Sequence, residues 1–182
     1  MISDHAKQGI SQIFTRACAS LTRDAGDSVA VNPLTVNPNS GGNFVEPPGQ
    51  LLVLTIANFS FKLLVIFHLE ANRETQQYFS RPEAGLGCAD VFPEIANLCC
   101  GAMNRELGGY FTHLGMSTPY SLDRQCLPFI EVLKPAYLAQ HRIVINGEVI
   151  LHATLCLCAY APVDFRYVAS APETASGTIE LF

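Results

Sequence analysis

A carboxylate and an amide, Glu94 and Asn97, stand three positions apart in a stretch whose pattern predicts a helix. Residues at this spacing share a helix edge, with their β-carbons about 5–6 Å apart. An amide offers both a donor and an acceptor, so it can hold a water molecule without adding negative charge. A carboxylate one turn away can pair with a cation. These two side chains are therefore the candidates for the chemistry of this chain.

Asp90 and Gly101 extend the same edge in the two directions along the helix. A glycine inside a helix costs roughly 1 kcal/mol relative to alanine, so Gly101 calls for a reason. Two reasons are open: clearance for the backbone of an approaching partner, or close helix–helix packing within the fold. Asp90 is expected to be the N-cap residue, with Pro93 accommodated in the first turn because no intrahelical donor is needed there.

The helix is predicted to run from Asp90 to about Leu107, where Gly108 and Gly109 end it. Four of its apolar residues fall within about 60° of one another on a helical wheel, which predicts a buried stripe beside the acid–amide edge. The predicted stripe consists of Val91, Ile95, Leu98 and Ala102.

Antiparallel strands are expected to support this helix. Residues 50–57 and 61–69 are β-rich runs that predict a largely buried hairpin. Residues 137–145 and 148–160 predict a second hairpin, which turns at Asn146-Gly147 because a type I′ turn requires positive φ at both central residues. The sequence thus predicts two hairpins on either side of the helix along the chain.

The remaining elements complete an α+β fold, in which a largely antiparallel sheet packs against two longer helices. Residues 3–21 predict an amphipathic helix capped by Ser3 or Asp4, and residues 110–116 predict a further strand. The whole chain, residues 1–182, is expected to be one domain with an irregular arm rich in Pro, Asn and Gly at about residues 24–49, which holds at most a short strand at 28–31.

Composition excludes several classes of function. A net charge of −5 with only 11 Lys and Arg leaves no basic stripe, so no nucleic-acid partner is expected. The apolar runs are too short to cross a bilayer, which predicts no membrane insertion and a cytoplasmic location. The seven cysteines are expected to be reduced. Cys99-Cys100 and Cys156-x-Cys158 lack metal-site spacing and are interpreted as small core residues.

The residues Asp90-Val-Phe-Pro-Glu94-Ile-Ala-Asn97, followed 22 positions later by Pro119, resemble the signature of the CheC/CheX chemotaxis phosphatases. That signature is Asp or Ser, three residues, Glu, two residues, Asn, and a distant Pro. The similarity extends more loosely from about Gln50 to Tyr160, although only the helix is diagnostic.

The resemblance implies a phosphatase that acts on the phosphoaspartate of a CheY-like response-regulator receiver. In this interpretation Asn97 orients the attacking water, Glu94 docks the receiver, Asp90 and Gly101 contact the partner, and Pro119 shapes a turn. The receiver's own Mg²⁺ neutralises the phosphoryl group, so the chain is expected to need no cofactor of its own.

The N-terminal helix carries Asp4-x3-Gln8-x2-Ser11, which lacks both the acid and the amide of the motif. The chain is therefore closest to single-site, CheX-like members, which implies a homodimer through joined sheets. A non-catalytic module of the same fold that binds a receiver or a flagellar-switch protein is the alternative, and a purely structural oligomeric domain is a third possibility.

Overall fold

The computed structural model describes residues 1–34, 49–70 and 72–169. These residues form a seven-stranded sheet with the spatial order β1-β6-β7-β3-β2-β4, and β5 also pairs with β2. All of these strand pairs are antiparallel. The strands are β1 (Val29–Leu34), β2 (Gly49–Ala57), β3 (Phe61–Glu70), β4 (Gly115–Met116), β5 (Tyr120–Leu122), β6 (Tyr137–Ile145) and β7 (Val149–Ala159).

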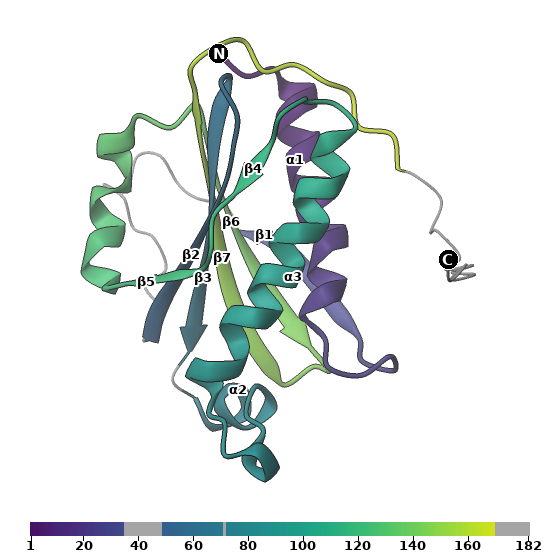
Figure 1. Cartoon of the computed structure of the whole chain (residues 1–182), viewed down its shortest axis with the longest axis vertical. Helices are drawn as coiled ribbons and strands as arrows, with labels where there is room; N and C mark the ends of the chain where they lie inside the picture. Colours follow the sequence, from purple (N-terminus) through teal and green to yellow (C-terminus); the bar gives the residue numbers. More distant parts are fainter. Residues whose placement is uncertain (35–48, 71, 170–182) are drawn as a thin grey trace, which may run out of the picture.

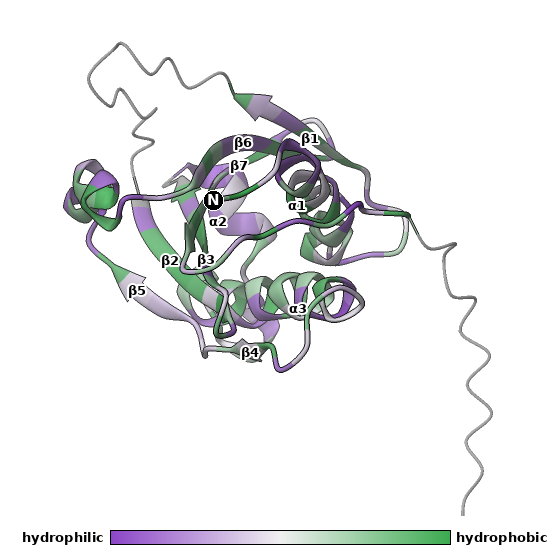
Figure 2. Cartoon of the chain, turned by 90° about the horizontal axis from the view of Figure 1, so that it is seen from above, coloured by the Kyte–Doolittle hydropathy of each residue, from purple (hydrophilic) through white to green (hydrophobic). Residues whose placement is uncertain are grey.

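Two long helices, α1 (Asp4–Ala17) and α3 (Cys88–Gly108), lie side by side over one face of the sheet (Figures 1 and 2). This arrangement confirms the predicted α+β class. Short helices complete the described part, and none of its helices is long and apolar enough to cross a membrane. The short helices are η1 (Cys18–Leu21), α2 (Arg73–Tyr78), η2 (Pro82–Ala84) and η3 (Arg124–Leu133). Ser3 is the N-cap of α1, since its Oγ accepts a hydrogen bond from the backbone N–H of Ala6 at 3.1 Å.

Both predicted hairpins are confirmed, and each is set by its turn residues. Asn58 closes the β2–β3 turn because its Oδ1 accepts hydrogen bonds from the backbone N–H groups of Ser60 and Phe61. Asn146 and Gly147 have φ values of 53° and 78°, as the β6–β7 turn was predicted to require. The loop also takes in Glu148, so β7 begins one residue later than predicted.

The strand β1 is longer than the predicted strand at 28–31, because it continues through Asn32 and Pro33. Within the described residues β1 pairs only with β6. Proline has no N–H to donate to a ladder, so it is tolerated at such an edge. Residues 35–48 of the predicted arm lie outside the described residues.

The strand predicted at 110–116 is wrong for most of its length, since only its last two residues, Gly115 and Met116, form a strand, β4, which pairs with β2. The backbone N–H groups of Tyr110 and Phe111 both donate to the carbonyl of Leu107, which keeps the chain coiled past the helix end. The Phe111 ring packs against Phe61, with 5.0 Å between ring centroids. This segment therefore covers the end of the core.

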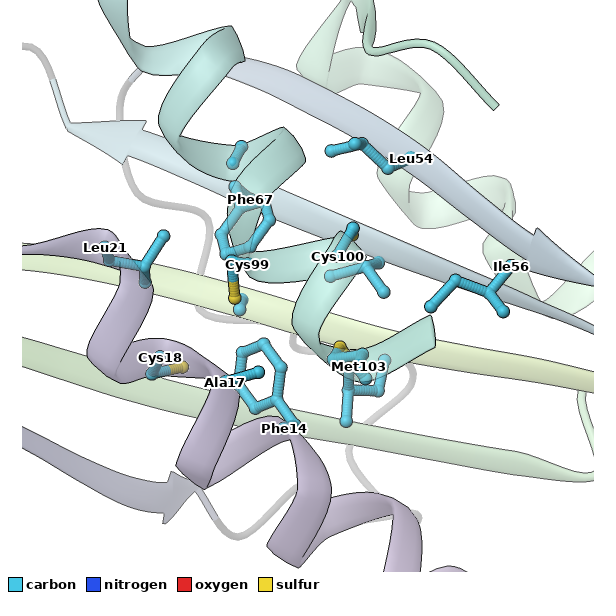
Figure 3. Packing of buried hydrophobic residues seen from close by; sticks show 14 of the residues in the cluster. Phe14, Ala17, Cys18, Leu21, Leu54, Ile56, Phe67, Cys99, Cys100 and Met103 are labelled. Carbon is cyan, nitrogen blue, oxygen red and sulfur yellow. The ribbon is translucent and has the colours of Figure 1, made fainter. Parts of the chain in front are cut away.

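The main core lies between the sheet and the two long helices (Figure 3). Phe67 of β3 is fully buried and packs against Phe14 of α1 and Phe92 of α3, with ring centroids 6.3 and 5.7 Å apart. Cys99 and Cys100 of α3 are also fully buried here. Their interpretation as core residues is confirmed.

A second, smaller core lies on the opposite face of the sheet, where η3 packs against β2, β3 and β7. In Figure 1 this helix is the green one on the side away from α1 and α3. Apolar side chains therefore project from both faces of the central strands. The residues of this core are Leu51, Val53, Ile66, Leu127, Ile130, Cys156 and Cys158.

Candidate functional site

The start of α3 corrects the predicted role of Asp90. The N-cap is Gly87, and Asp90 is the third helical residue, where its Oδ2 accepts a hydrogen bond from the Gly87 N–H at 2.9 Å. The helix begins early because Arg81 and Leu86 exchange two backbone hydrogen bonds, which turns the chain just before Gly87. Asp90 thus caps the start of α3 from within the first helical turn, as the acidic residue of a capping box does.

Pro93 consequently lies in the second turn of α3, one turn later than predicted. A proline there leaves the carbonyl four residues earlier, that of Ala89, without its helical donor. Ala89 is exposed, so water can satisfy this carbonyl.

The buried face of α3 is broader than the predicted stripe and is centred elsewhere. Val91 and Ile95 are buried as predicted, but 62% of the Leu98 surface is exposed. The helix packs on both the sheet and the α1–η1 segment, so it buries a wide arc that extends away from Leu98. The buried residues of α3 are Cys88, Val91, Phe92, Ile95, Ala96, Cys99, Cys100, Met103 and Leu107.

Glu94 and Asn97 lie together on the accessible edge of α3, as the spacing predicted. Glu94 is exposed and Asn97 is half-buried. Among the described residues, neither side chain forms a hydrogen bond or an ion pair. The carboxylate and both ends of the amide are therefore available to a partner and its water.

Gly101 belongs to this edge, and its surroundings bear on the packing explanation for it. A β-carbon placed there would meet only Nη1 of Arg105, at the ordinary contact distance of 3.7 Å. Close packing within the chain therefore does not require glycine at this position. Clearance for a partner, the other explanation, stays a prediction.

Gly101→Ala is accordingly expected to raise the free energy of unfolding by about 0.5–1 kcal/mol, the difference in helix propensity. Urea unfolding monitored by circular dichroism measures this change. Gly9→Ala in α1 is the matched control, because its β-carbon would lie 2.7 Å from Cε2 of Phe165 and should destabilise the fold. Loss of stability in Gly101→Ala would instead show that the fold itself needs this glycine.

Pro119 lies on the connection between β4 and β5. The preceding Ser117 fixes this connection to β2: its N–H donates to the carbonyl of Thr55, and its Oγ accepts from the Thr55 N–H, both at 2.9 Å. This placement agrees with a role in shaping the chain path.

The corresponding positions of α1 are committed to other contacts. Asp4 forms an ion pair with Lys7 at 2.8 Å, and the Ser11 hydroxyl hydrogen-bonds to Nε2 of His141 at 3.0 Å. Burial lowers the pKa of His141 to about 4, so its imidazole is neutral near pH 7. A base this weak is unsuited to activate Ser11, and the contact is structural.

Two further residues lie on the α3 edge: Leu98, which was predicted to be buried, and Arg105, to which the sequence analysis assigned no role. Arg105 is exposed and follows Gly101 by one turn. The four-residue spacing from Gly101 to Arg105 could have placed Arg105 on this edge from the sequence. The exposure of Leu98 could not be read from the sequence, because it depends on which neighbours cover the helix. Within the described ranges, no three His, Cys, Asp or Glu side chains are grouped to hold a metal ion.

Comparison by sequence gives no matching family model and no matching curated protein. Comparison by structure gives CheX of Borrelia burgdorferi, solved in a complex with CheY, BeF₃ and Mg²⁺, with a TM-score of 0.53 and 7% identity over 82% of this chain and 96% of that one. CheX of Vibrio vulnificus matches with a TM-score of 0.52 and 12% identity over 86% and 97% of the two chains. A protein assigned to chemotaxis from Desulfovibrio vulgaris Hildenborough matches with a TM-score of 0.53 and 11% identity over 82% and 96%. The chain described here has the fold of the CheX chemotaxis proteins.

Proposed function

We propose that this chain is a protein-aspartyl-phosphate phosphatase that acts on a CheY-like receiver domain. The observation that carries the proposal is the accessible acid–amide pair, Glu94 and Asn97, on a helix edge of a CheX-like fold. The Borrelia CheX structure contains CheY with BeF₃ and Mg²⁺, which supports a receiver as the partner.

The reaction is the hydrolysis of an acyl phosphate. A water molecule attacks phosphorus in line, the bond from phosphorus to the aspartyl oxygen breaks, and the products are inorganic phosphate and the receiver's free carboxylate. Mg²⁺ on the receiver neutralises the phosphoryl oxygens, so the helper mainly has to orient the water. The Asn97 amide can do this without repelling the phosphoryl group, whereas a carboxylate there would add negative charge.

Glu94 supplies docking in this proposal, by pairing with a lysine of the receiver's active site. Asp90 flanks it one turn earlier with a carboxylate already engaged by Gly87, and Gly101 gives the partner room on the other side. We further propose that the protein acts in the cytoplasm as a homodimer joined through its sheets. It would need no cofactor of its own.

Glu94→Ala is expected to weaken binding to a phosphorylated receiver by about 10- to 150-fold, since a charge-assisted contact contributes roughly 1.5–3 kcal/mol. Titration against a receiver loaded with BeF₃⁻ and Mg²⁺ measures the dissociation constant. Glu131→Ala is the control, because it removes the same charge from an exposed position on η3, on the opposite face of the sheet. Equal affinities for both variants would refute the docking role.

A further inference from the structure

Leu98 is an apolar side chain that the fold leaves in solvent next to the acid–amide pair. It follows Glu94 by four residues and Asn97 by one, and 62% of its surface is exposed. Residues four apart share a helix face, so Leu98 lies directly beside Glu94 on the edge. The core makes little use of this side chain.

Leu98 belongs to a strip of side chains along α3, which consists of Glu94, Leu98, Gly101 and Arg105. Glu94 lies at one end, Gly101 follows Leu98, and Arg105 lies at the other end, a span of about 17 Å at 1.5 Å per residue. Acid, apolar side chain, glycine and base therefore succeed one another on a single exposed face. An apolar centre flanked by charges is the usual anatomy of a specific protein–protein contact.

We propose that Leu98 is the apolar anchor of the receiver-docking surface, and that Arg105 is its second charged contact. The inference rests on the proposed function and names how the same site selects its partner. The occupant is the phosphorylated receiver domain. By charge complementarity, the receiver should present a cation to Glu94 and a carboxylate to Arg105. Between them it should present an apolar patch that covers Leu98.

The position of Gly101 agrees with this role. A β-carbon at Gly101 would meet nothing but Arg105, so the strip has a shallow gap directly after Leu98. A partner's backbone can approach through that gap and cover the Leu98 side chain. Water exclusion around a central apolar residue is what makes such a residue dominate binding.

Leu98 does not present a group that can touch the reacting atoms, so its effect is expected in binding alone. Leu98→Ala should raise both the dissociation constant and KM about tenfold and leave kcat unchanged. Leu98→Met, which keeps the apolar bulk, should restore most of the affinity. Arg105→Ala should slow association at low salt, and the difference should disappear at high salt.

The experiment uses the full chain and a panel of CheY-like receivers. Binding is measured with BeF₃⁻ and Mg²⁺ on the receiver, and kcat and KM are measured by phosphate release from the phosphorylated form. Val132→Ala is the control, because Val132 is 74% exposed on η3 and should change neither quantity. Because Leu98 is exposed, thermal unfolding should be close to that of the wild type in every variant.

The outcomes separate this inference from the proposed function. A wild-type chain that binds and dephosphorylates a receiver, with Leu98→Ala equal to it in affinity and KM, overturns the anchor role only. A fall in kcat at constant KM also overturns it, since Leu98 would then act on the chemical step. A wild-type chain that neither binds nor dephosphorylates any receiver overturns both.

Discussion

Asn97→Ala is expected to lower the accelerated dephosphorylation of the receiver by about 100-fold or more, to near the receiver's own rate. A catalyst that acts by placing a water in line loses about this factor when the water is no longer held. The side chain is only half-buried and has no partner among the described residues, so the fold should tolerate alanine. Phosphate release under single-turnover conditions measures the effect.

Gln12→Ala is the matched control for Asn97→Ala, because it removes an exposed amide from α1, the long helix without the acid–amide pair. It should leave the rate unchanged. Asn97→Asp should be as inactive as the alanine variant, since the new charge repels the phosphoryl group. Full activity in Asn97→Ala would remove Asn97 from the mechanism, and a wild-type chain that binds receivers without hydrolysis would support the non-catalytic alternative.

Phe67→Ala is expected to lower the free energy of unfolding by about 3–5 kcal/mol, the usual cost of truncating a large buried side chain. Phe67 touches aromatic rings of both α1 and α3, so its loss leaves a cavity where the two helices meet the sheet. Chemical unfolding curves, analysed for midpoint and slope, measure the change. Receiver dephosphorylation should fall in parallel with the folded fraction.

Phe59→Ala is the control within the same hairpin. Phe59 lies in the β2–β3 turn with 94% of its surface exposed, so its removal should change stability by less than about 0.5 kcal/mol. Equal losses for the two variants would contradict the packing described for this core.

The hairpins could be predicted because their turns are determined locally. Asn146 and Gly147 are residue types that readily adopt positive φ, as they do here, and the β6–β7 register follows from this turn. The strand predicted at 110–116 had no comparable local signal. Its apolar residues fill the end of the core, a tertiary requirement that the sequence pattern does not distinguish from strand pairing.

The candidate site was predictable in one respect and not in another. The spacing of Glu94 and Asn97 places both on one edge of any helix, so their joint exposure follows once an edge is accessible. The buried face depends on what surrounds the helix: of the four predicted stripe residues, Val91, Ile95 and Ala102 pack on the core, but Leu98 does not. Cysteines and alanines also line the core, which moved its centre away from Leu98.

The order of the strands has a consequence for how the chain folds. The β2–β3 and β6–β7 hairpins are local in sequence, but the centre of the sheet is made by β3 and β7, where Phe61 pairs with Ala159 and Leu69 with Leu151. Before such distant segments can form stabilising contacts, a long loop must close, and the loss of chain entropy in that step slows folding. Between those two strands the chain forms α3, so we expect the edge that carries Glu94 and Asn97 to gain its support from the sheet only when β3 and β7 have paired.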